Sequence, residues 1–117
     1  MEITTKQQLE IFLTVYAELE QILQPNSIDQ IIKDKILYRA TERLLGVIAV
    51  TVKRLQKLNP QWQIPHYKTV LRLKNTVLWN FDNLRPAYLN FILSTALPKI
   101  YQYLNSKYLS FKQNEIH

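Results

Sequence analysis

Hydrophobic residues recur at intervals of three and four along almost the whole chain, which is the spacing of an amphipathic helix with one buried face. The first such stripe covers residues 9–23, and Thr4 or Thr5 precedes it as a candidate N-cap with a glutamine three residues later. Ser27 has the same relation to Gln30 and begins a short apolar segment. The pattern therefore predicts a first helix, a break and a short second helix.

The longest predicted helix spans residues 34–58. Its apolar positions form a wide face, as expected of the central element of a helical bundle. Gly46 lies inside it, where glycine costs about 1 kcal/mol relative to alanine. We interpret this glycine as a place where another helix approaches closely. Asn59 and Pro60 end the helix, because proline supplies no N–H to continue it.

Two more helices are predicted, one over residues 67–80 and a last one after residue 83. Pro98 predicts a bend in the last helix, because it removes one backbone hydrogen bond. No stretch shows convincing alternation of apolar and polar residues. We therefore expect an all-α protein, an antiparallel bundle of four to five helices, with one domain over residues 1–111 and a frayed tail over residues 112–117.

The composition excludes most familiar active sites. The 117 residues include no cysteine, one glycine and two histidines. Without cysteine there are no disulfides and no thiolate metal sites, and one glycine cannot build the loops that cradle phosphates. The carboxylates of Glu10, Glu18 and Glu20 do not converge on one point of a helix. We therefore expect no metal and no cofactor.

Basic residues are concentrated in the middle third of the chain, which has a formal net charge of +6. Residues 43–81 hold no acidic residue and seven basic ones: Arg43, Lys53, Arg54, Lys57, Lys68, Arg72 and Lys74. Such a block suits RNA, DNA or an acidic protein as a partner. The alternative that composition leaves open is a solvated basic surface with no partner.

The sequence predicts a cytoplasmic location and no membrane partner. Its first residues lack the basic head and apolar run of a secretory signal. The longest apolar stretch, residues 44–52, is far shorter than the roughly 20 residues that span a bilayer. Trp62 lies in the predicted loop after the long helix, and the sequence leaves open whether it anchors a partner or covers the bundle.

Three short segments carry a family resemblance, and residues 72–81 are the most specific. Together with an Arg-Leu-Leu element at residues 42–45 and a Leu-Pro element at residues 97–98, they resemble the HepT-like branch of the HEPN superfamily over about residues 7–106. The resemblance implies an all-helical homodimer. Many members are ribonuclease toxins of toxin–antitoxin pairs, each typically held in check by a small MNT-type nucleotidyltransferase.

The resemblance also implies where a catalytic site would lie. The family motif is an arginine, four residues, a histidine, one residue and a tyrosine, with a polar residue after the arginine. These positions fall on Lys74, Asn75, Trp79 and Phe81. Trp79 has no titratable nitrogen that could accept or donate the proton of a 2′-hydroxyl. Lys74 keeps the positive charge but cannot bind a phosphate through two parallel hydrogen bonds, as arginine does. Phe81 lacks the tyrosine hydroxyl. Large aromatic side chains at positions 79 and 81 favour a filled cleft over base stacking.

Three hypotheses follow. In the first, the chain is a HepT-like protein whose ribonuclease site has decayed, and it acts as a dimeric binding or regulatory subunit with a nucleotidyltransferase partner. In the second, it is an active metal-independent ribonuclease that uses Lys74, Asn75 and His66. In the third, it is a non-catalytic basic helical module that binds RNA.

Overall fold

The structure is a computed structural model that describes residues 4–79 and 86–116, and their side chains except at 74–79 and 115–116. All regular structure within these ranges is helical, so the predicted all-α bundle is confirmed. The elements are α1 (Thr5–Leu23), α2 (Ile28–Lys33), α3 (Lys35–Leu58), α4 (Tyr67–Trp79), α5 (Pro86–Phe91), the π-helical turn η2 (Ile92–Ala96) and α6 (Leu97–Ile116).

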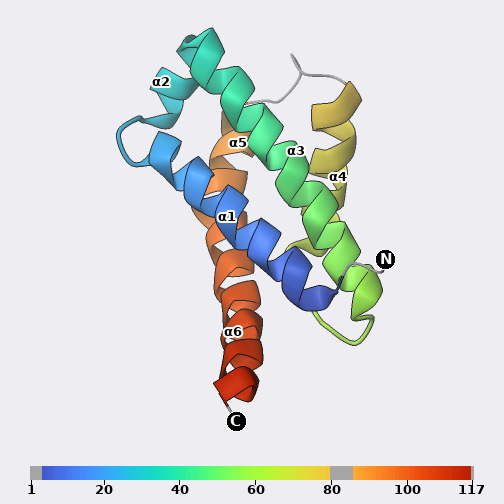
Figure 1. Cartoon of the computed structure of the whole chain (residues 1–117). Coiled ribbons are helices and arrows are strands. Elements are labelled where there is room, and N and C mark those ends of the chain that lie inside the picture. Colours follow the sequence, from blue (N-terminus) through green and yellow to red (C-terminus); the bar gives the residue numbers. More distant parts are fainter. Residues whose placement is uncertain (1–3, 80–85, 117) are drawn as a thin grey trace.

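The helix α3 is the centre of the bundle. It lies antiparallel beside α1 and also packs against α4, while α6 packs against α1 (Figure 1). The elements α5, η2 and α6 follow one another without a gap and form one rod, whose C-terminal part extends beyond the other helices (Figure 1). The molecule is accordingly elongated, with principal extents of 49 × 27 × 26 Å.

Short polar motifs set the first helix boundaries, as the sequence predicts. The Thr4 hydroxyl accepts a hydrogen bond from the Gln7 backbone N–H at 3.1 Å, and the Gln7 side chain accepts one from the Thr4 N–H at 2.9 Å. Ser27 and Gln30 form the same reciprocal pair. The Asp34 carboxylate accepts the backbone N–H groups of Ile36 and Leu37 in the first turn of α3. Both predicted capping boxes are therefore confirmed.

The core lies between α1, α3, α4 and the rod formed by α5, η2 and α6. Phe12 stacks on Tyr16 with ring centroids 5.9 Å apart, and Tyr16 stacks on Tyr101 of α6 at 4.5 Å. Gly46 is buried within an unbroken α3. Gln8 is also fully buried, and neither amide atom of its side chain has a hydrogen-bond partner within the described part of the chain.

The last helix differs from the sequence prediction at two places. At the predicted bend, the chain forms a π turn in which the Leu97 N–H bonds to the Ile92 carbonyl five residues earlier. This wider turn comes directly before Pro98, whose missing N–H cannot supply the ordinary bond. We also expected a frayed tail from residue 112, but α6 continues to Ile116.

The phenol of Tyr16 makes the fold sensitive to high pH. Burial, and secondarily the Glu20 carboxylate, raise the pKa of Tyr16 to about 12. The pKa of tyrosine in the unfolded chain is about 10. The neutral phenol therefore stabilises the folded state fully below pH 10, and this stabilisation is lost as the pH rises toward 12.

At pH 11 we expect the parent protein to have lost about 1.4 kcal/mol of unfolding free energy that Tyr16→Phe retains. Urea denaturation of both proteins at pH 8 and pH 11 measures this difference. The ionisation of surface lysines is common to the two proteins and cancels. Equal losses in both would contradict the prediction.

Candidate functional site

The motif positions implied by the resemblance fall on α4 and on the chain after it. Lys74, Asn75 and Trp79 occupy the last turns of α4, and Phe81 lies outside the described residues. Positions 74 and 79 are five residues apart on an unbroken helix, which separates them by about 140° around its axis. The structure describes α4 up to Trp79, and the predicted end at residue 80 lies outside the described residues. The backbone of α4 therefore does not bring these positions onto one face.

His66 lies at the other end of α4. Its carbonyl accepts the Val70 N–H at 3.1 Å, which begins the helix. Its φ of 55° is in the left-handed region that residues other than glycine seldom adopt. Its ring packs edge-on against Phe91, with centroids 5.6 Å apart. Because Lys74 follows eight residues later, its backbone lies about 12 Å further along the helix axis.

The predicted basic residues of α3 share one exposed face. Arg43, Lys53, Arg54 and Lys57 are all exposed. At about 100° per residue, the four positions fall within a sector of about 100° on the helix surface. On the neighbouring α4, Lys68 and Arg72 are exposed and lie one turn apart.

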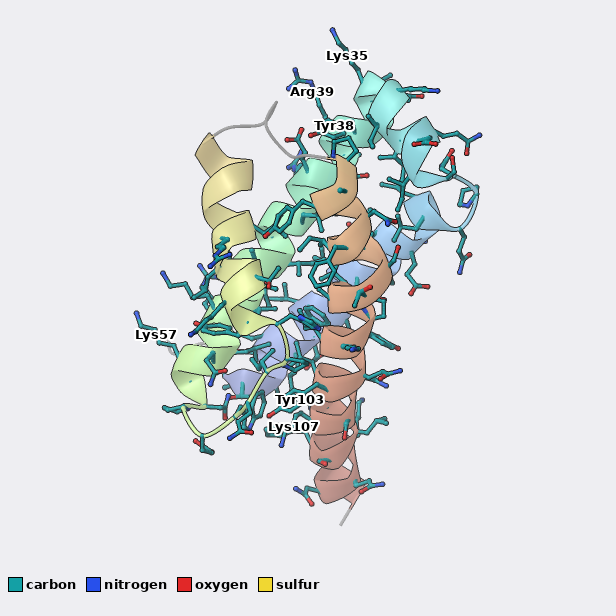
Figure 2. The ribbon with its side chains drawn as sticks, turned by 180° about the vertical axis from the view of Figure 1, so that it is seen from behind. Lys35, Tyr38, Arg39, Lys57, Tyr103 and Lys107 are labelled. Carbon is teal, nitrogen blue, oxygen red and sulfur yellow. The ribbon has the colours of Figure 1, made fainter. Side chains whose placement is uncertain are left out.

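Two further cations that the sequence analysis did not select extend this face. Lys35 and Arg39 are exposed, and they fall in the same sector as Arg43 because the three are spaced at intervals of four residues. Figure 2 shows Lys35 and Arg39 projecting from one end of α3 and Lys57 from the other. From Lys35 to Lys57 the cations span about 33 Å, in two groups of three that are separated by the stretch between Arg43 and Lys53. We call it the α3 basic face and define it as Lys35, Arg39, Arg43, Lys53, Arg54 and Lys57.

The acidic residues near this segment in the sequence are buried, cap a helix or belong to another helix. Glu42, the one acidic residue of α3, is only 3% exposed. Asp34 precedes α3, and its carboxylate is engaged in capping the helix. The exposed carboxylates of Glu10 and Glu18 belong to α1.

Apolar side chains are interspersed with these cations. Ile36, Val47 and Leu58 are 81%, 39% and 48% exposed. Their helical positions lie within the sector of the α3 basic face or directly beside it. The face therefore offers a ligand both positive charge and apolar contact.

The described residues offer little else that resembles an active site. They contain no group of three metal-binding side chains. A hollow along α6 is lined by side chains of that helix alone, from Tyr101 to Gln113, so it does not enclose a ligand. No helix in the described ranges is long and apolar enough to cross a membrane.

Comparisons of this chain with protein-family models, with curated proteins and with solved structures find no match. The HepT-like resemblance therefore stays a prediction that rests on the short motifs in the sequence.

Proposed function

We propose that this chain is a non-catalytic binding protein of HepT-like descent that binds RNA through the α3 basic face. The observation that carries the proposal is the alignment of six exposed cations along about 33 Å of one helix whose single acidic residue is buried. A nucleic acid presents phosphates at regular intervals, so it engages several such cations at once and releases condensed counterions.

The identity of the motif residues supports a role without catalysis. Metal-free cleavage of RNA needs a group that titrates near neutral pH, and the resemblance puts Trp79 at the histidine position. His66 directly precedes α4, about 12 Å along the axis from Lys74, and its ring is engaged with Phe91. In this proposal α4 contributes the exposed cations Lys68 and Arg72 beside the α3 basic face.

The proposal also includes a dimer and a protein partner. Both follow from the family resemblance, in which the subunit forms homodimers and pairs with a small nucleotidyltransferase. The exposed apolar side chains Ile36 and Leu58 give a protein partner apolar contact at the two ends of α3.

Binding to a labelled RNA of about 20 nucleotides tests the proposed function. We expect the parent protein to bind the RNA and leave it intact. The triple substitution Lys53→Gln, Arg54→Gln and Lys57→Gln is expected to weaken binding by roughly tenfold to a hundredfold, because three phosphate contacts are lost.

The matched control removes the same charge elsewhere. Lys33, Lys99 and Lys112 are exposed on α2 and α6, and their triple replacement by glutamine is expected to change binding less than about threefold. Equal losses in the two triple variants would contradict a defined binding face. Cleavage of the RNA that either Lys74→Ala or His66→Ala abolishes would instead support an active ribonuclease.

A further inference from the structure

The exposed sides of α1 and α3 form one surface of the molecule. The two helices lie side by side in front of the rod formed by α5, η2 and α6 in Figure 1, and Figure 2, from behind, shows that rod in front of them. The core residues of both helices point back into the bundle, so their exposed residues point away from it. The α3 basic face is one half of this surface, and the exposed side of α1 is the other.

Carboxylates occupy the α1 half of the surface. Glu10 and Glu18 are both exposed, and each lies two positions from a buried residue of the core, which places it about 160° around the helix from that residue. The other two charged residues of α1, Lys6 and Glu20, are half-buried. The fully exposed charges of α1 are therefore both negative.

A hydrogen bond fixes which residues of the two helices lie at the same height. The Asn59 side-chain amide donates to the Thr5 hydroxyl at 3.1 Å, and the antiparallel helices run side by side from this point. Five residues along each helix, or about 7.5 Å, lead to Glu10 on α1 and to Arg54 on α3. This carboxylate and this guanidinium are therefore at the same height on the surface.

The second carboxylate has a similar counterpart. Glu18 lies about 12 Å beyond Glu10 along α1, and Arg43 lies about 17 Å beyond Arg54 in the same direction along α3. Within the described residues, no ion pair joins either carboxylate to a cation of the α3 basic face. Since all four side chains are exposed and leave one another unpaired, they present both signs of charge to a partner.

Apolar side chains and the size of the surface also suit a protein partner. Ile11 is 41% exposed and lies within about 20° of Glu18 around α1, and the exposed Val47 follows Arg43 by one turn. Two helices of about 10 Å width present roughly 560 Å² over the ~28 Å length of α1. This area is near the lower end for specific protein pairs, so we expect a weak, micromolar contact.

We propose that a second copy of this chain binds this surface, with the carboxylates of α1 of each copy against the cations of α3 of the other. A surface with both signs of charge fits a partner that carries both. A twofold axis parallel to the helices lays α1 over α3 without a change of height. Glu10 of one copy then meets Arg54 of the other, Glu18 meets Arg43, and each pair occurs twice. Such complementary charges fix the register of an interface.

Charge reversal tests the interface. At about 50 mM salt and about 100 µM protein, we expect light scattering to give twice the 13.9 kDa of one chain. Glu10→Arg with Glu18→Arg, and separately Arg43→Glu with Arg54→Glu, are each expected to weaken the dimer at least about 30-fold, because like charges then face each other. An equimolar mixture of the two variants is expected to form a heterodimer, because opposite charges meet again. A monomeric parent, or a mixture that stays monomeric, would overturn the inference.

A matched control reverses two charges elsewhere. Lys99 and Lys112 are exposed on α6, and Lys99→Glu with Lys112→Glu is expected to keep the mass of the parent. Circular dichroism and thermal denaturation show whether each variant is folded. If a reversal unfolds the chain, Glu10→Gln with Glu18→Gln replaces it, and this neutral pair is expected to weaken the dimer about tenfold. A neutral pair that dimerises like the parent would contradict the interface.

The outcomes separate this interface from the proposed function. The second copy covers part of the α3 basic face and therefore competes with RNA, a consequence that rests on the proposed function. Glu10→Arg with Glu18→Arg leaves α3 unchanged, so it is expected to lose the dimer and to bind RNA at least as tightly as the parent. If this variant stays dimeric, the interface is wrong and RNA binding stands. If neither protein binds RNA, the proposed function fails, and the masses alone decide the interface.

Discussion

Raising the salt concentration from about 50 to about 200 mM is expected to weaken the binding of single-stranded RNA to this protein roughly 300-fold. Each phosphate neutralised by a cation releases a counterion, and for single strands the logarithmic slope is about −0.7 per contact. The six exposed cations of the α3 basic face therefore give a slope of about −4 when all of them contact phosphates. Fluorescence anisotropy at four salt concentrations measures this slope.

The slope also separates a defined face from a general charge effect. Neutralising Lys53, Arg54 and Lys57 is expected to reduce its magnitude to about 2, because three contacts are removed. The control that neutralises one lysine of α2 and two of α6 is expected to keep a slope near −4. An affinity that does not change with salt would contradict RNA binding by the α3 basic face.

Replacing Gln8 by methionine is expected to raise the free energy of unfolding by about 1–3 kcal/mol. The Gln8 side chain is fully buried, and its two amide atoms make no hydrogen bond within the described residues. Folding therefore removes this amide from water without an equivalent bond in return. Methionine has a similar unbranched shape and no polar group that needs a partner. Urea denaturation at neutral pH measures the gain.

An exposed glutamine of the same helix is the control for this substitution. Gln21 is exposed on α1, and Gln21→Met is expected to change the unfolding free energy by less than about 0.5 kcal/mol. A gain at both positions would point to the properties of methionine in a helix, and no gain at Gln8 would contradict the cost of its buried amide.

The parts of the fold that depend on neighbouring residues were predictable from the sequence. The capping boxes at Thr4 and Ser27 need only a residue three positions later, so both were found. The bounds of α3 were also predicted to within one residue, because Asp34 and Pro60 act on the adjacent backbone. The all-α architecture follows from these local signals.

Features that depend on distant contacts were not predictable. Trp62 and Tyr103 are 41 positions apart, and no local pattern indicates that their rings meet. The exposure of Lys35 and Arg39 was missed for a different reason. Counting charge by sequence blocks placed them with the acidic residues, although intervals of four residues would have joined them to Arg43. No pattern in the sequence indicates that the Glu42 side chain is buried.

For the candidate site, the block of basic residues in the sequence indicated Arg43, Lys53, Arg54 and Lys57, but not that they share one side of a helix. The motif-based positions on α4 came from the resemblance, and their assignment to a site remains a prediction. The α3 basic face emerges only once the four residues are placed on a single helix.

The π turn at Ile92–Ala96 sets the rotational phase of the helix that follows it. It holds one more residue per turn than the α-helix around it. If the same residues formed an ordinary α-helical turn instead, α6 would be turned by about 100°, the rotation of one α-helical residue, relative to α5. Tyr101 and Tyr103 would then face away from Tyr16 and Trp62, their present ring partners. The conformation of this one turn thus determines both the stacking of Tyr101 on Tyr16 in the core and the contact of Tyr103 with Trp62.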